Sequence, residues 1–144
     1  MKEINVYRLA LVKEKSTPYK AIGRPDDIYA ILKSLGLDTA AEEYFYVLCT
    51  DCKGQITGIH EVSHGDLSSS VANAREIYKR ALLNNSAAVV LCHNHPSGDT
   101  YPSDEDRRVT HRLVDAGDLL GIKVLDHIIV GMNGYFSFKQ EGLM

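Results

Sequence analysis

A short apolar run that leads into two histidines constrains this chain more than any other stretch. Residues 87–92 read Ala-Ala-Val-Val-Leu-Cys, a short β-branched run that is typical of a buried strand. His93 and His95 follow at its end. Side chains on a strand alternate between its two faces, so histidines at this spacing share a face and can converge on one ion. The run therefore predicts a buried strand that ends at His93 and presents two metal ligands.

A helix start signal follows after a turn at Pro-Ser-Gly-Asp, residues 96–99. Residues 102–106 read Pro-Ser-Asp-Glu-Asp and precede apolar residues at 109, 113, 116 and 120. Ser103 suits the N-cap position, and acidic residues in a first turn are favoured by the positive end of the helix dipole. A short loop can return this first turn to the end of the strand. The pattern predicts a helix from Ser103 to about Leu120, with Asp106 as a third ligand.

Two imidazoles and one carboxylate leave the fourth position of a tetrahedral zinc ion for water, which is the arrangement of catalytic sites. Closed structural zinc sites usually use more cysteine. The pair Cys49-x-x-Cys52 has no second such pair and flanks Thr-Asp at a predicted strand-to-turn junction. Cys92 would point to the face of its strand opposite the histidines. We therefore expect a catalytic type of zinc site that does not use the cysteines.

The spacing His93-x-His95-x7-Ser103-x2-Asp106 resembles the JAMM metalloprotease motif of the JAB/MPN superfamily. His-Asn-His-Pro-Ser-Gly-Asp at 93–99 and Leu-Asp-His-Ile-Ile-Val-Gly at 125–131 are similar to the bacterial RadC family, and the resemblance extends from about Glu43 onward. It implies an α/β fold of the α+β type, with a mixed β-sheet flanked by helices in a cytidine-deaminase-like sandwich. The resemblance also implies that longer RadC relatives carry an N-terminal helix-hairpin-helix region, which we expect to be missing from this chain.

The resemblance also implies roles for individual residues. It makes His93, His95 and Asp106 the zinc ligands, and Ser103 the motif serine that hydrogen-bonds the tetrahedral oxyanion or the bound water. Capping of the helix competes with that role of Ser103. His127 is expected to support the site from behind or to be structural.

Hydrolysis also needs a carboxylate that takes a proton from the attacking water. The pattern of residues alone leaves Glu42, Glu43, Glu61 and Glu76 open. JAMM proteins place their glutamate just before an apolar strand, and residues 44–48 read Tyr-Phe-Tyr-Val-Leu. The resemblance therefore favours Glu43 as the general base.

These features predict a zinc-dependent hydrolase of amide bonds, and the resemblance implies a metallopeptidase or isopeptidase that acts on an unidentified peptide or isopeptide. The chief alternative is a DNA-associated accessory protein of the RadC type, related to DNA repair or mobile elements, with a structural or vestigial zinc. The net charge of −3 and an isoelectric point near 6.0 predict weak or absent DNA binding. A zinc deaminase would need His-x-Glu followed by Pro-Cys-x-x-Cys, and the sequence has neither.

The 144 residues match one domain, residues 1–144, and leave the oligomeric state open. No apolar stretch approaches the roughly 20 residues that span a bilayer, and the first residues lack a signal-peptide pattern. A secreted chain would tend to pair its cysteines, and three is an odd number. We therefore expect a cytoplasmic protein without a membrane partner.

The remaining elements follow from periodicity and turn residues. We expect a first strand over 4–12 and a helix from Arg24 that Gly36 ends, with a buried stripe at 28, 31, 32 and 35. A hairpin is predicted from strands 44–49 and 55–62, then a polar loop over 63–70 and a helix over 71–83. A strand over 122–130 and a turn lead to a last strand over 135–138. The expected order is β, α, β, β, α, β, α, β, β.

Overall fold

The computed structural model describes residues 1–17, 19, 23–65 and 73–144 of the chain. The helices of these residues are α1 (Pro25–Ser34), α2 (Ala74–Leu83) and α3 (Asp104–Leu120). The strands are β1 (Glu43–Thr50), β2 (Ile56–Gly65), β3 (Ala88–Asn94), β4 (Lys123–Gly131) and β5 (Gly134–Ser137). From α1 onward, this order is the predicted one.

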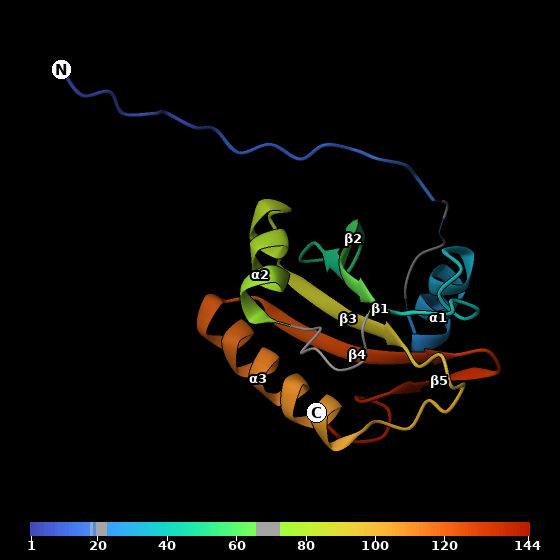
Figure 1. Ribbon diagram of the computed structural model, residues 1–144. Coiled ribbons are helices and arrows are strands. Elements are labelled where there is room, and N and C mark those ends of the chain that lie inside the picture. The colour runs from blue at the N-terminus through green and yellow to red at the C-terminus, as the bar shows by residue number, and fades with distance from the viewer. Residues whose placement is uncertain (18, 20–22, 66–72) are drawn as a thin grey trace.

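The strands form one mixed sheet in the order β2-β1-β3-β4-β5 (Figure 1). β3 and β4 are parallel, while the other neighbouring pairs are antiparallel. Parallel neighbours need a long crossover connection, and α3 supplies it between β3 and β4. The predicted α+β fold with a mixed sheet flanked by helices is confirmed.

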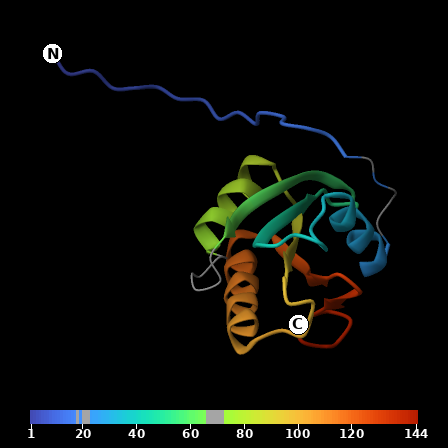
Figure 2. The same cartoon turned by 45° about the vertical axis from the view of Figure 1, so that its right-hand side comes forward.

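The helices cover both faces of the sheet, with α1 on one face and α2 and α3 on the other (Figures 1 and 2). Two apolar clusters fill the spaces between these layers. One joins α2 and α3 to residues of β1 and β3 such as Val47 and Leu91, and the other joins α1 to residues such as Leu48 and Cys92. Central strands that are covered on both faces read as continuous apolar runs, and all of β3 is buried. Within the described ranges, no helix has the length and apolar character needed to span a lipid bilayer.

Helix α3 begins and ends at the signals that the sequence carries. The side chain of Ser103 accepts a hydrogen bond from the backbone N–H of Asp106, and the Asp106 carboxylate accepts one from the N–H of Ser103. This reciprocal capping box satisfies donors that the first helical turn leaves unpaired. At the other end Gly121 adopts the left-handed conformation, with φ of 73°. The predicted helix is confirmed, and its first turn faces the end of β3.

Several predicted strand ends differ from the structure by one to three residues, and two of them lie near the histidines. β2 continues past Val62 to Gly65, because residues 63–65 pair with Phe45, Tyr44 and Glu43 of β1. β3 does not stop at His93, because Asn94 pairs with Val130 of β4.

Asn73 caps α2 by accepting a hydrogen bond from Glu76 N–H. Residues 66–72 lie outside the described residues. They include the rest of the loop predicted over 63–70 and the first residues of the helix predicted over 71–83.

The predicted strand over residues 4–12 is wrong for the single chain. Residues 1–17 adopt neither helix nor strand, and they extend away from the sheet in both views (Figures 1 and 2). A strand exists only where its backbone N–H and C=O groups pair with another strand. We call residues 1–17 the N-terminal arm. Its residues have the composition of a strand, but no described strand of the same chain pairs with them.

Candidate metal centre

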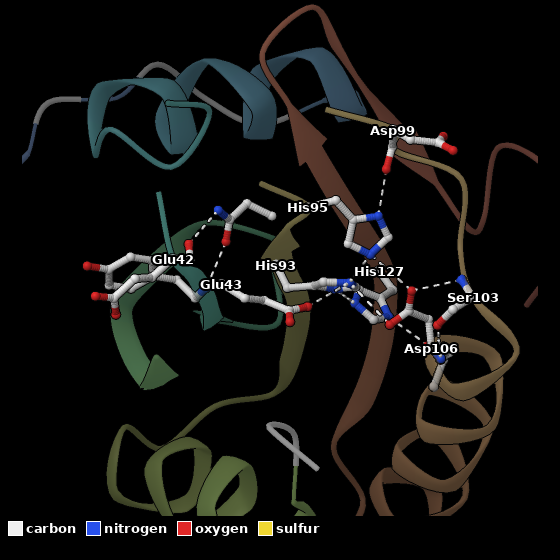
Figure 3. A network of polar contacts seen from close by, with 11 residues as sticks. Glu42, Glu43, His93, His95, Asp99, Ser103, Asp106 and His127 are labelled. Carbon is white, nitrogen blue, oxygen red and sulfur yellow. Dashed lines mark hydrogen bonds and ion pairs between the residues drawn. The ribbon is translucent and has the colours of Figure 1, made fainter. Parts of the chain in front are cut away.

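Three elements bring five of the predicted site residues to one end of the sheet (Figure 3). His93 lies in β3 and is directly opposite Phe45 of β1, whose ring stacks on its imidazole. Glu43 lies two residues before Phe45 and therefore on the same face of the sheet. Asp106 lies in the first turn of α3, which packs over that face. The sheet register thus aims Glu43, His93 and His95 at the start of α3, where Ser103 and Asp106 lie.

The nitrogens and oxygens of the two histidines and Asp106 converge closely. His93 Nε2 lies 3.1 Å from His95 Nε2. One carboxylate oxygen of Asp106, Oδ1, lies 3.3 Å from His93 Nε2, and the other, Oδ2, lies 3.1 Å from His95 Nε2. Zinc bonds of about 2.0–2.1 Å give a tetrahedron with edges of about 3.3 Å. Each pair of these residues therefore offers two donor atoms near the separation that one tetrahedral ion requires, so the donor set fits a zinc ion.

Glu43 faces the same donors from the opposite side. Its carboxylate oxygen lies 4.0 Å from His93 Nε2, and ligand atoms of Glu43, His93 and His95 all lie within 4.8 Å of one another. The histidine pair is thus shared between two possible metal-binding triads, one closed by Asp106 and one by Glu43. The 4.0 Å separation between Glu43 and His93 is longer than a tetrahedral edge, whereas each pair of residues in the triad with Asp106 has donor atoms near that length.

The other glutamates considered for the base lie elsewhere. Glu61 pairs with His64, and Glu76 pairs with Lys79 and Arg80 on its own helix. Glu42 is exposed, and as the neighbour of Glu43 it does not share its face. Among these four candidates, Glu43 is the carboxylate beside the histidines.

Hydrogen bonds on the far side of each imidazole turn its Nε2 toward the centre. The Nδ1 atom of His95 lies 2.7 Å from the backbone oxygen of Asp99, and the Nδ1 atom of His93 lies 2.7 Å from Nε2 of His127. A carbonyl can only accept, so His95 Nδ1 carries the proton and its Nε2 presents a lone pair. A metal-ligating histidine commonly has such a partner on its other nitrogen.

His127 continues a buried chain of hydrogen bonds from His93 into α3. Its Nδ1 lies 2.6 Å from the Thr110 hydroxyl, which donates to the backbone carbonyl of Asp106 at 2.6 Å. Burial holds the pKa of His127 well below its usual range, and the neighbouring His93 lowers it further. The ring of His127 is therefore neutral. Only one direction then satisfies every group: His93 Nδ1–H donates to His127, and His127 Nδ1–H donates to Thr110. His93 is therefore held with Nε2 as its lone-pair nitrogen.

The charges of the centre reflect burial and close pairing. Burial raises the pKa of Glu43, and the nearby histidines only partly offset this effect. Burial also acts on Asp106, but the facing imidazoles of His93 and His95 and the backbone N–H of Ser103 outweigh it and hold the pKa of that carboxyl well below its usual range. Asp106 is therefore a persistent anion, and Glu43 is the carboxylate that more readily takes a proton.

A family model described as a RadC-like JAB domain matches residues 22–143. The chain belongs to the RadC family. This family is part of the JAB/MPN superfamily, and the predicted resemblance is confirmed over nearly the whole chain.

Curated relatives carry the same family likeness. A UPF0758 protein of Methanosarcina barkeri is 44% identical over 127 residues, which cover 88% of this chain and 55% of that protein. A UPF0758 protein of Symbiobacterium thermophilum is 48% identical over 102 residues, which cover 71% of this chain and 44% of that protein. A UPF0758 protein of Trichlorobacter lovleyi is 50% identical over 103 residues, which cover 72% of this chain and 45% of that protein. This RadC chain spans about half the length of the curated relatives it matches.

Ser103 of this RadC chain is occupied as the cap of α3. Its oxygen accepts from Asp106 N–H at 3.0 Å, and the residue is exposed at the rim of the centre (Figure 3). A hydroxyl that accepts a cap hydrogen bond still has its own hydrogen to donate. Capping and contact with a ligand are therefore compatible for Ser103.

Asn94 is a positioning residue that was not predicted. It lies between the two histidines, so its side chain points to the other face, where it accepts from Tyr44 N–H at 2.7 Å and donates to Glu42 C=O at 2.9 Å. This clamp holds the backbone on both sides of Glu43. Its signal in the sequence was a polar residue in an otherwise apolar strand, since a buried amide needs partners.

Thr110 was also missed. It lies one turn after Asp106 on the same helix, a spacing that points both side chains the same way. The cysteines, in contrast, follow the prediction: all three are free thiols, and Cys92 packs into the core cluster on the α1 side, away from the histidines.

Proposed function

We propose that this RadC-family chain is a zinc-dependent hydrolase of amide bonds, of the metallopeptidase or isopeptidase type. The observation that carries the proposal is the spacing of the donors of His93, His95 and Asp106, at 3.1–3.3 Å from one another, with Glu43 beside them at 4.0 Å. Imidazole nitrogens and a carboxylate suit zinc. This donor set would hold an ion with three protein ligands, and the Glu43 carboxylate would lie next to the fourth position.

His93, His95 and Asp106 would hold the zinc, which when bound supplies a Lewis acid that polarises a carbonyl and makes water a better nucleophile near neutral pH. The anionic Asp106 neutralises part of the charge of such an ion. Its carboxylate is held by the N–H of Ser103 at 2.9 Å, and so it is already oriented toward the histidines.

Glu43 accepts the proton of the attacking water and passes it to the leaving nitrogen of the amide. Efficient general bases have a pKa closer to the working pH than an exposed glutamate has, and burial raises the pKa of Glu43 in that direction. The Asn94 clamp on Glu42 and Tyr44 fixes where this carboxylate points. The base is therefore held by the sheet rather than by a loose loop.

Ser103 and His127 complete the assignment. The Ser103 hydroxyl donates a hydrogen bond to the substrate oxygen as negative charge develops on it, which is how donors at an oxyanion stabilise a transition state. His127 and Thr110 hold His93 in the tautomer that presents Nε2. We also propose a cytoplasmic setting, because a reducing compartment keeps thiols in the free state that all three cysteines show.

The test is a screen of peptide and isopeptide libraries with the zinc-loaded wild type, followed by Glu43→Gln on every substrate that is cleaved. Loss of the base should lower the rate about 10²- to 10⁴-fold while the zinc content stays the same. Glu42→Gln is the matched control, since the neighbouring side chain is exposed, and it should keep full activity. Unchanged cleavage by Glu43→Gln would refute the assignment of the base.

A further inference from the structure

The N-terminal arm carries a dense set of uncovered apolar side chains. Ile4, Val6, Tyr7, Leu9, Leu11 and Val12 are between 53% and 95% exposed. Single exposed apolar residues are normal, but soluble proteins rarely leave contiguous apolar segments uncovered unless they bind something. The same residues have the β-rich composition that predicts a strand. The arm therefore needs a sheet edge to pair with and a surface to cover its side chains.

The sheet offers one long edge. β2 spans residues 56–65 at the end of the strand order, and no described strand pairs with its outer side. Natural proteins protect such edges with charged residues, above all lysine, with proline, or with β-bulges. β2 contains Glu61 but no lysine or proline, and its pairing with β1 has two irregularities in register. The opposite edge is β5, which has only four residues. Of the two edges, only β2 has the length to receive another strand of nine residues.

Tyr19, which follows the arm in the chain, contacts this edge. The Tyr19 hydroxyl donates to the backbone carbonyl of Ile56, the first residue of β2, at 3.2 Å. If the chain ran antiparallel along its own β2 with Tyr19 opposite Ile56, residue 10 would lie opposite Gly65. Residues 4–9 would then run past the last described residue of the strand. In that register, the described part of β2 has no room for residues 4–9 of the same chain.

We propose that residues 4–12 of the arm pair with the β2 edge of a second copy of this chain, so that two copies exchange arms. Nine extended residues span about 30 Å, close to the length of the ten-residue β2. An exchange between two equal copies is closed, because each arm is used and each β2 edge is covered. This inference does not depend on the proposed hydrolase activity.

The test is the mass of the 144-residue chain in solution by sedimentation over a wide range of concentration. The wild type should be a dimer, with twice the mass of the 16.0 kDa chain. Val6→Lys/Leu9→Lys puts two charges into the exchanged strand and should raise the dissociation constant of the dimer at least about tenfold. Leu119→Lys is the matched control, because Leu119 is also highly exposed but lies on α3, and it should leave the dimer unchanged.

Amide hydrogen exchange over residues 4–12 gives a second measurement that does not depend on a variant. These amides should be protected in the dimer and lose protection on dilution. A monomer at every concentration overturns the proposal, whether the arm is unprotected or protected by its own chain. A dimer that Val6→Lys/Leu9→Lys leaves intact also overturns it. Both variants lie outside the core, so circular dichroism should show an unchanged fold.

Discussion

The strand end with the two histidines and the N-terminal arm differ most in what surrounds them. β3 lies between β1 and β4 and is buried along its whole length. The arm is extended and exposed, and no described strand of the chain pairs with it. Both segments have the composition of a strand. The comparison shows that composition predicts which residues can form a strand, while the strand itself depends on a partner for its backbone groups.

The two regions also differ in how their chemical groups are satisfied. Around His93 and His95, each imidazole nitrogen that faces away from the centre has a hydrogen-bond partner within the same chain. On the arm, apolar side chains lack cover from their own chain. We therefore expect the metal centre to work within one chain, and the arm to become ordered only in an assembly.

The largest expected effect separates these two regions directly. His93→Ala/His95→Ala should reduce bound zinc from about one ion per chain to nearly none, because it removes two of the three ligands. Val6→Lys/Leu9→Lys should keep the wild-type zinc content, as should Cys49→Ser/Cys52→Ser. Metal analysis after dialysis measures all of them. Zinc loss in the arm variant would mean that a second copy contributes to the centre, and equal zinc in the double alanine variant would place the ion elsewhere.

A smaller effect is expected from the buried hydrogen-bond chain behind His93. Thr110→Val keeps the shape of the side chain but removes the hydroxyl that His127 donates to. Loss of such a supporting partner typically weakens metal affinity about 10- to 100-fold. Zinc titration of Thr110→Val should show this loss, and Thr110→Ser should restore most of the affinity. If Thr110→Val bound zinc with wild-type affinity, the hydrogen-bond chain through His127 would not support the metal ligand His93.

The smallest expected effect is a change with pH in the stability of the metal-free protein. The pKa of His127 is depressed by burial, so below the unfolded pKa of about 6.5 the unfolded chain binds a proton that the folded chain does not. The free energy of unfolding that His127 contributes should then fall by about 1.4 kcal/mol per pH unit as the pH drops below 6.5.

The difference in unfolding free energy between wild type and His127→Gln isolates this contribution. His95, whose pKa is raised, acts in the opposite sense but is present in both proteins. Urea unfolding with a chelator, at several pH values below 7, measures the difference. It should shrink toward acid pH. A difference that is constant or grows toward acid pH would mean that His127 is protonated in the folded protein.

Local signals predicted the parts of the site that lie on one continuous stretch. The apolar run and the His-x-His spacing predicted β3. The Ser103 cap predicted the start of α3 and the approach of Asp106. These features could be predicted because each depends on neighbours within a few residues. The choice among four glutamates did not follow from the residues themselves, because it depends on the register that sets Phe45 opposite His93. A resemblance to known proteins selected Glu43, and the sheet pairing explains its position.

Contacts between distant segments account for what was missed or wrong. The extra residues of β2 pair with Glu43, Tyr44 and Phe45, and Asn94 holds the backbone of residues about fifty positions away. Thr110 matters through His127, which comes from another element. The strand expected over 4–12 has no partner among the described strands of its own chain, which no local pattern reveals.

The central claim is that Asp106 closes the metal-binding triad and Glu43 stands outside it. Zinc titration of Glu43→Gln and Asp106→Asn tests this without any substrate, since each variant keeps the shape of its side chain and removes its charge. We predict near wild-type affinity for Glu43→Gln and an affinity more than about a hundredfold weaker for Asp106→Asn, a larger loss than a supporting partner gives. Strong loss in Glu43→Gln with zinc retained by Asp106→Asn would contradict the account, because Glu43 would then be the ligand.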